Sequence, residues 1–191
     1  MAAPLKGLPA QTYSLIRNGS GAQFLKLRVC STAGELVQVK SRGLDVHLTA
    51  PVNVFNIYSL QPCPSATPLG PKAQAAARAS IAQVSASFPI QPLFVQREGL
   101  PCTGMGTSTA DTIAAALVHA KLARRSITRA QLAKLISSIE RSDGISYDGV
   151  CLVDQREGRL LRTHPVPPWK VLIVVPKTRI ATEEVQPYAH R

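Results

Sequence analysis

The chain has few aromatic residues, no closely spaced cysteines and no long apolar run. Aromatic residues make up 5% of its 191 residues, so the stacking platforms that bind single-stranded nucleic acids are poorly supplied. The four cysteines, Cys30, Cys63, Cys102 and Cys151, form no C-x-x-C pair, which argues against a zinc site and against a disulfide framework. No apolar run is long enough to span a bilayer, and no charged head precedes an apolar segment at the start, as a signal peptide would require. We therefore expect a cytoplasmic protein with free thiols and no membrane partner.

Positive charge and apolar residues are abundant instead. The net charge is +11, and hydrophobic residues make up 45% of the chain, which is ample for a folded core. Such a charge fits an anionic partner, whether a nucleotide, a phosphorylated metabolite or a nucleic acid. The basic residues form no block, however, and Arg124-Arg125 is the tightest pair. Charge alone therefore leaves the partner open.

The most informative segment is GMGTSTAD at 104–111, directly ahead of the helix-forming residues 112–118. A flexible loop that leads into a helix leaves backbone N–H groups unpaired at the positive end of the helix dipole. Such a site binds phosphate, and the hydroxyls of Thr107 and Ser108 are available to a phosphate oxygen or to Mg²⁺. The alternative interpretation is an ordinary helix N-cap, for which Gly, Ser and Thr are also typical.

Hydropathy patterns predict an α/β domain. We expect strands at 24–29, 44–48, 52–58 and 93–97, and a hairpin of 150–153 with 159–162. Residues 30–35 have the composition of a turn, and the proline-rich residues 61–71 that of a loop. Helices are predicted at 72–85, from the glycine loop to about 124, and after a capping box at 128–131.

The pattern also suggests a division of the chain. We expect residues 1–22 to form a loose leader and residues 23–164 to form one domain. Residues 165–191 would begin with a stiff proline linker. The segment 170–175, apolar on both faces, is typical of a covered strand and predicts the first strand of an incomplete second domain.

Three motifs in this order resemble those of the GHMP small-molecule kinases. They are CSTAGELVQ at 30–38 with the following Pro51-Val52-Asn53, the glycine loop at 104–111, and ERSDG at 140–144. The resemblance covers roughly residues 24–175 and is strongest to the L-threonine kinase branch linked to cobalamin synthesis. It implies an α/β (α+β) fold with the architecture of the GHMP kinase N-terminal domain. That architecture is a mixed, mostly antiparallel sheet backed by helices.

The resemblance also implies roles for particular residues, with ATP and Mg²⁺ as cofactors. The ATP phosphates would be bound by Gly104, Met105, Gly106, Thr107, Ser108 and Thr109. Mg²⁺ would be bound by Ser108 and Glu140, and Asp143 would orient or deprotonate the acceptor hydroxyl. Glu35 and Asn53 would lie near the acceptor pocket. Plainer alternatives remain open: Glu140 and Asp143 as a solvated helix end, and Glu35 as a turn residue paired with a lysine or arginine.

The chain departs from the family pattern in three places. Leu100 stands where the family loop has a proline, Thr107 replaces the first serine, and no glycine follows Gly158 to supply the second glycine-rich motif of the family's C-terminal domain. The leading hypothesis is ATP-dependent phosphorylation of a small-molecule hydroxyl by a truncated or split kinase, with a separately encoded C-terminal domain as its partner in the split case. The alternative is a non-catalytic or partial nucleotide-binding domain. A nucleic-acid-binding function has only the net charge in its favour, and we expect no such partner.

Overall fold

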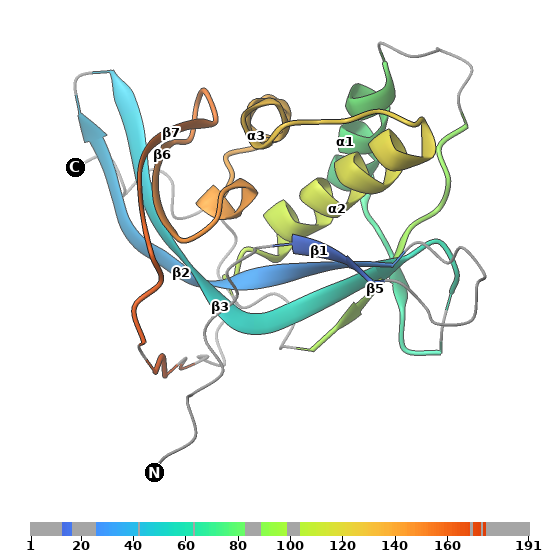
Figure 1. Ribbon diagram of the computed structural model, residues 1–191, viewed down its shortest axis with the longest axis horizontal. Helices are drawn as coiled ribbons and strands as arrows, with labels where there is room; N and C mark the ends of the chain where they lie inside the picture. The colour runs from blue at the N-terminus through green and yellow to red at the C-terminus, as the bar shows by residue number, and fades with distance from the viewer. Residues whose placement is uncertain are drawn as a thin grey trace.

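The computed structural model describes residues 13–16, 26–41, 43–62, 64–82, 89–98, 104–168, 170–172 and 174. These residues form one curved, antiparallel sheet with helices on its inner side (Figure 1). The strands are β1 (Tyr13–Ile16), β2 (Lys26–Ser41), β3 (Leu44–Ser59), β4 (Thr67–Pro68), β5 (Phe94–Arg97), β6 (Val150–Asp154) and β7 (Arg159–His164). The helices are α1 (Pro71–Ile81), α2 (Thr107–Leu122), α3 (Arg129–Ser137) and the 3-10 turn Gly144–Ser146.

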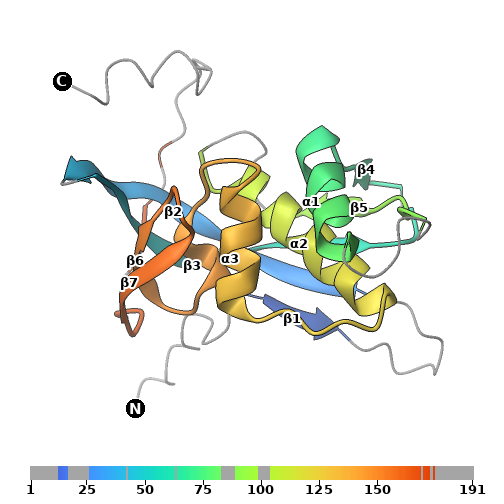
Figure 2. The same cartoon turned by 90° about the horizontal axis from the view of Figure 1, so that it is seen from above.

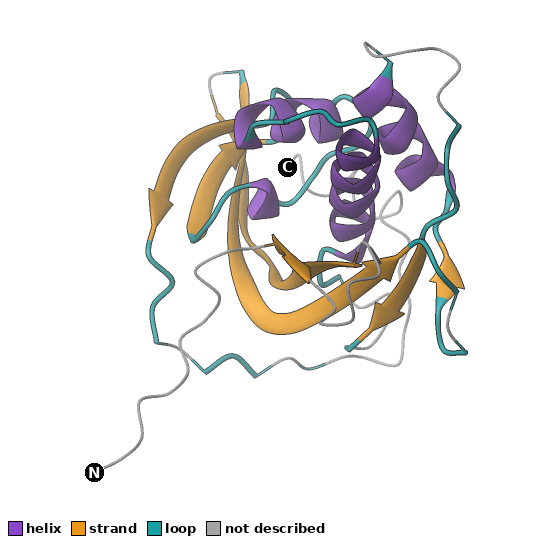
Figure 3. Cartoon of the chain, turned by 45° about the vertical axis from the view of Figure 1, so that its right-hand side comes forward, coloured by secondary structure: helices purple, strands orange, loops and turns teal. Residues whose placement is uncertain are grey.

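The strand order explains why β3 is central to the fold. The seven-stranded sheet runs β1-β2-β3-β5-β4, and β6 with its partner β7 also pairs with the first part of β3. Figure 3 shows how the long strands curve around the helices. The predicted fold class, an α+β domain with a mostly antiparallel sheet backed by helices, is confirmed.

The core forms where α1 and α2 pack on the sheet. Alanines on the facing sides of the two helices, among them Ala73, Ala77 and Ala114, are buried and allow a close approach of the backbones. Larger side chains such as Ile113 and Tyr58 fill the space above the sheet. Seen from above, α1, α2 and α3 lie over the sheet (Figure 2). The packing fixes the start of α2 against β2 and β3.

Two local predictions about the first long hairpin are wrong. Residues 30–35 are not a turn, and 44–48 and 52–58 are not separate strands, because β2 and β3 run through both segments as 16-residue strands. Bulges absorb the irregular residues: Cys30 pairs with Phe55 while Ser31 pairs with Val52, and a second shift lies between Thr32 and Glu35. The small and flexible residues therefore bend the strand instead of reversing the chain.

Other boundaries also differ from expectation. Four residues of the expected leader, Tyr13–Ile16, form β1 and pair with β2, and β4 lies within the expected loop 61–71. The described residues of 170–175 form no strand, and Leu172 and Val174 are 89% and 79% exposed. The helix predicted at 72–85 ends at Ile81, and residues 83–85 lie outside the described part of the chain.

Local signals with a defined hydrogen-bonding pattern were predicted correctly. Thr128 and Gln131 form the expected capping box at the start of α3, with the Thr128 side chain accepting from the Gln131 backbone N–H. The hairpin of β6 and β7 and the strand β5 also lie where the sequence placed them, to within two residues at each end. These elements depend on residues that are close together in the chain.

Candidate functional site

The glycine loop is held against β2. The Thr32 backbone N–H donates to the Met105 carbonyl oxygen at 3.0 Å, and a Cβ added to Gly34 would lie 3.5 Å from the Gly104 carbonyl oxygen. The bulge around Thr32 and Gly34 therefore brings the CSTAGELVQ motif into contact with the loop. Two sequence motifs that are far apart in the chain meet here.

The start of α2 has no side-chain cap. Gly106 is the N-cap residue, it has φ +68°, and as a glycine it makes no side-chain cap hydrogen bond. Gly is also a common N-cap residue, so this position alone does not separate an ordinary cap from a phosphate site. The hydroxyl of Ser108 makes its hydrogen bond elsewhere, as described next. The positive end of the helix dipole at such a start is suited to an anion.

Glu140 joins the start of α2. The Ser108 hydroxyl donates to Glu140 Oε2 at 2.7 Å, and the Thr112 hydroxyl lies 3.4 Å from Glu140 Oε1. Lys72 Nζ, from the first turn of α1, lies 2.9 Å from the same Oε2. The Glu140 side chain is nearly buried, while the Lys72 side chain is 61% exposed. The two predicted metal-binding residues, Ser108 and Glu140, are thus adjacent, with a cation beside them.

Asp143 lies on the other side of the loop. Its backbone N–H donates to the Thr109 hydroxyl at 3.1 Å, and its Oδ1 lies 3.8 Å from His47 Nε2. A Cβ added to Gly106 would lie 2.5 Å from Asp143 Oδ2, so the carboxylate packs directly on the loop backbone. The Asp143 side chain is only slightly exposed. The solvated helix end that was an alternative for Glu140 and Asp143 does not describe these contacts.

The two residues predicted near the acceptor pocket are less defined. Glu35 lies in β2 opposite Thr49, and its side chain is outside the described part of the structure. Asn53 is exposed and lies where β3 bulges between the Ser31 and Cys30 pairings. The Glu35 backbone belongs to an irregular strand and not to the turn expected there.

Asp111, the last residue of the glycine-loop motif, has a structural role. It accepts hydrogen bonds from the Tyr58 hydroxyl at 2.8 Å and from Arg97 Nη2 at 2.8 Å, while Arg97 Nη1 also contacts Asn56. Burial and the neighbouring carboxylate raise the pKa of Tyr58 well above its ordinary value of 10. This network fixes the first turns of α2 to β3 and β5.

Sequence reasoning missed Lys72, Thr32, Thr49 and His47. Nothing in its local sequence distinguishes Lys72 from other surface lysines. The 44–48 segment did carry a signal, because Asp45 and His47 alternate with apolar residues, but period-two alternation does not indicate which face is buried. In the structure the polar face is the buried one: Asp45, His47 and Thr49 are each at most 1% exposed.

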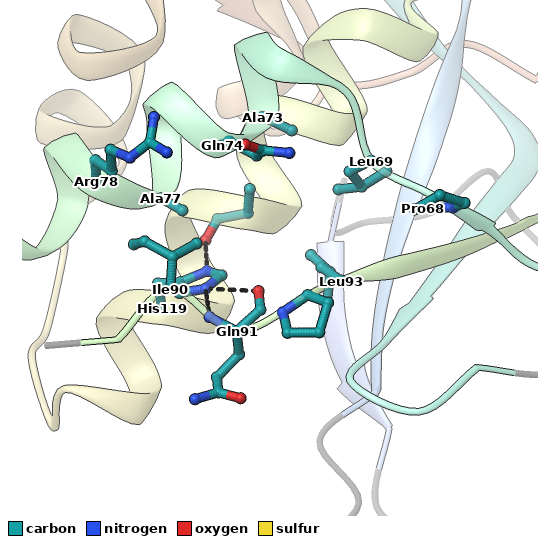
Figure 4. Close-up of a pocket in the computed structure, with 12 residues that line it drawn as sticks. Pro68, Leu69, Ala73, Gln74, Ala77, Arg78, Ile90, Gln91, Leu93 and His119 are labelled. Carbon is teal, nitrogen blue, oxygen red and sulfur yellow. Dashed lines mark hydrogen bonds between the residues drawn. The ribbon is translucent and has the colours of Figure 1, made fainter.

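A separate cavity lies between α1, α2 and residues 90–93. Its volume is about 300 Å³, and Leu69, Ala77, Ile90, Leu93 and His119 are among the residues around it (Figure 4). Both ring nitrogens of His119 are engaged by backbone groups: Nδ1 lies 2.8 Å from the Ala115 oxygen, and Nε2 accepts from the Gln91 N–H at 3.1 Å. None of the predicted site residues lines this cavity.

Within the described residues, no group of three or more His, Cys, Asp or Glu side chains is arranged to hold a metal ion. A site for Mg²⁺ that is shared with nucleotide phosphates needs only one or two carboxylates, so this finding bears on resident metals and not on Mg²⁺-ATP. None of the helices in the described ranges is long and apolar enough to cross a membrane. Burial raises the pKa of the Cys30 thiol to about 12, which makes it a poor nucleophile.

Comparison with known protein families found one match in this region of the chain. Residues 73–152 match the model of the GHMP kinases N terminal domain. The match contains the glycine loop, α2, α3 and the ERSDG segment, and so Ser108, Glu140 and Asp143, while Thr32, His47 and Lys72 lie outside it. A search of curated proteins found no match to the chain. The matched model describes a domain of small-molecule kinases, a family that generally uses ATP.

Proposed function

We propose that the chain binds Mg²⁺-ATP at the start of α2 and transfers the γ-phosphoryl group to the hydroxyl of a small molecule. The observation that carries this proposal is the convergence of Ser108, Glu140 and Asp143 on one helix start, inside the segment that matches the family model. A helix start alone binds many anions. The two carboxylates on opposite sides of the loop are what favour phosphoryl transfer.

The phosphates would be bound by the loop backbone and the first turn of α2. Gly104 and Gly106, with φ of +70° and +68°, let the loop turn tightly, and its backbone N–H groups would bind the phosphate oxygens. Lys72 is placed to neutralise phosphate charge from the side of α1, because its ammonium already lies beside Ser108 and Glu140. The net charge of +11 would further favour the approach of a nucleotide.

The residues present fit Mg²⁺. A hydroxyl oxygen from Ser108 and carboxylate oxygens from Glu140 are hard donors of the kind this ion prefers, and the nucleotide phosphates would complete its coordination. Mg²⁺ would supply charge neutralisation on the phosphate oxygens. Lys72 would then turn from Glu140 toward a phosphate, since both cations compete for the same carboxylate oxygen.

Asp143 is the proposed base. The acceptor oxygen attacks the γ-phosphorus, the bond from the γ-phosphorus to the bridging oxygen breaks, and ADP leaves. The hydroxyl proton passes to the Asp143 carboxylate, which faces the loop that holds the phosphates. Because phosphoryl transfer depends mainly on positioning and charge neutralisation, the fixed distance between Asp143 and the loop is the main contribution of the fold.

For the acceptor, we propose an amino-acid hydroxyl, with L-threonine as the first candidate. This choice rests on the resemblance of the three motifs to the L-threonine kinase branch, and the CSTAGELVQ motif lies beside the glycine loop through Thr32. Glu35 and Asn53 are proposed to contact the acceptor.

Two measurements test the proposal. The first follows the unfolding temperature during titration with Mg²⁺-ATP, because a ligand that binds the native state raises it. The second follows ADP release in the presence of L-threonine, L-serine, L-homoserine or ethanolamine, with Asp143→Asn as the inactive control. Stabilisation by ATP without ADP release for any acceptor would favour a nucleotide-binding domain. No stabilisation at millimolar Mg²⁺-ATP would contradict the nucleotide site, and strongly salt-dependent RNA or DNA binding would then favour a nucleic-acid partner.

A further inference from the structure

The buried face of β3 is polar over the segment that passes beneath the site. Asp45, His47 and Thr49 are buried there, while Leu44 and Val46 on the opposite face are only partly buried. Burying polar side chains in place of apolar ones costs free energy unless each has a partner. Because polar residues are buried here where apolar residues are usual, we expect this face of β3 to make specific polar contacts.

All three residues contact the ERSDG segment. Asp45 Oδ2 lies 3.4 Å from Arg141 Nη2, His47 Nε2 lies 3.8 Å from Asp143 Oδ1, and the Thr49 hydroxyl accepts from the Gly144 N–H at 3.1 Å. Alternate residues of β3 thus meet successive parts of residues 141–144. The strand acts as a template that fixes the segment carrying Asp143.

His47 is itself held in one orientation. The Gln155 side-chain amide, just after β6, contacts His47 Nδ1, and the Gln155 backbone N–H donates to the Asp45 carbonyl oxygen at 2.8 Å. When the amide nitrogen donates to Nδ1, the proton of the neutral ring is on Nε2. That N–H is the group on the Asp143 side of the ring.

We propose that His47 is a positioning residue that orients the Asp143 carboxylate through its Nε2–H group. The proposal rests on the proposed function, in which Asp143 accepts the proton of the acceptor hydroxyl. A base held by a second buried polar group, itself oriented by a third, is a general arrangement for a side chain that must accept a proton in a defined direction. The 3.8 Å separation would shorten when substrates bind, as hydrogen bonds in unliganded sites commonly do.

Other titratable groups lie near this pair. Cys30 on β2 lies close enough to Asp143 for the carboxylate to help raise the thiol pKa, and Asp45 on β3 is paired with Arg141. Glu140 is engaged by Ser108 and Lys72 on the far side of the loop. Among the charged pairs described here, the pair that includes Asp143 is the one with His47.

The first test needs no enzymatic activity. Nitrogen-15 NMR of histidine-labelled protein distinguishes the two neutral tautomers, and His47→Gln identifies the His47 signals. We expect the Nε2-protonated form, and Asp143→Asn should shift the Nε2 signal more than the Nδ1 signal. Gln155→Leu should reduce the preference for this tautomer. A neutral His47 ring protonated on Nδ1, or an Nε2 signal that does not shift in Asp143→Asn, would overturn the proposal.

The second test uses turnover. His47→Leu should lower kcat by about 10-fold or more while the KM for ATP changes little, since general-base contributions are typically 10²–10⁴-fold. His47→Gln keeps an N–H donor near the Nε2 position and should restore most of the lost kcat. Unchanged kcat in His47→Leu would contradict the proposal. If His47→Leu fails to fold, Gln155→Leu takes its place and should lower kcat in the same direction.

The two tests separate two kinds of failure. Wild-type protein that releases no ADP with any acceptor would contradict the proposed kinase function, while the NMR result would still decide whether His47 directs its N–H at Asp143. Wild-type turnover with the wrong tautomer would remove the role of His47 and leave the kinase function standing.

Discussion

Gly106 and Asp143 face each other across the start of α2. A Cβ on Gly106 would lie 2.5 Å from Asp143 Oδ2 and 2.9 Å from Thr32 Cγ2, so no side chain fits between the loop and either neighbour. The φ of +68° at Gly106 also disfavours any other residue. The bare backbone at this position lets a carboxylate from the segment after α3 approach the proposed phosphate site.

Gly106→Ala should be more damaging than Gly104→Ala. Gly104 has a similar φ of +70° but open space where its Cβ would lie. We expect Gly104→Ala to lower the free energy of unfolding by about 1 kcal/mol, the backbone cost alone. Gly106→Ala adds the steric overlap and should cost about 2 kcal/mol or more and displace Asp143. Urea unfolding measures both variants, and equal costs would mean that Asp143 does not pack on the loop.

Ser108→Ala and Glu140→Gln should weaken the binding of Mg²⁺-ATP. Ser108→Ala removes a hydroxyl oxygen that could bind Mg²⁺, and Glu140→Gln removes the negative charge of a carboxylate that could bind it. We expect each substitution to lower the affinity for Mg²⁺-ATP about 10-fold. Ser108→Ala should change the unfolding temperature of the ligand-free protein little, because Ser108 is exposed. Glu140→Gln keeps the size and the hydrogen-bonding oxygen of the nearly buried side chain and loses only an ion pair with the exposed Lys72, so its effect should also be small.

Calorimetric titration with ATP in Mg²⁺ and in EDTA provides the control. In the wild-type protein, ATP affinity should be higher in Mg²⁺ than in EDTA, and this difference should be smaller in Glu140→Gln. The ATP affinity of Glu140→Gln in EDTA should equal or exceed that of the wild-type protein. The same loss of affinity in both buffers would mean that Glu140 acts on the fold and not on the metal.

Lys72→Met should lower ATP affinity several-fold in both buffers, because the lysine is proposed to contact phosphate directly. Lys121→Met, in the last turn of α2, makes the same charge change at the far end of that helix and is the matched control. We expect Lys72→Met to lower ATP affinity more than Lys121→Met does. We also expect the ATP affinity of Lys72→Met to depend less on salt concentration than that of the wild-type protein. Equal effects would indicate only the loss of overall positive charge.

Alkaline pH should destabilise the fold. The pKa of Cys30 is about 12 in the folded chain against an ordinary value of 9.0, so between these values the folded state retains a proton that the unfolded state releases. Stability should therefore be complete below pH 9 and fall above it, by up to about 1.4 kcal/mol per pH unit for this group. The raised pKa of Tyr58 acts in the same direction.

Urea unfolding between pH 8 and pH 11 measures this effect. Cys30→Ala should be less stable than the wild type at pH 8 because it leaves a small cavity, but its stability should fall less steeply above pH 9. Parallel curves for the wild-type protein and Cys30→Ala would show that the thiol ionises normally in the folded state.

The sequence by itself determined the features that depend on neighbouring residues. The capping box at Thr128, the glycine loop leading into α2 and the β6–β7 hairpin follow from local hydrogen-bonding and turn rules. The order of the three motifs also indicated the fold class and the kind of family that residues 73–152 match.

Only the tertiary structure decided which residues meet. Strand pairing turned an expected turn at 30–35 into a bulge against the glycine loop, because the partner strand β3 continues past it. The tertiary structure also buries the polar face of β3, and the alternation of polar and apolar residues alone cannot specify which face is buried. Lys72 and His47 joined Ser108, Glu140 and Asp143 because long-range packing of α1, α2 and β3 sets distances that local sequence rules do not encode.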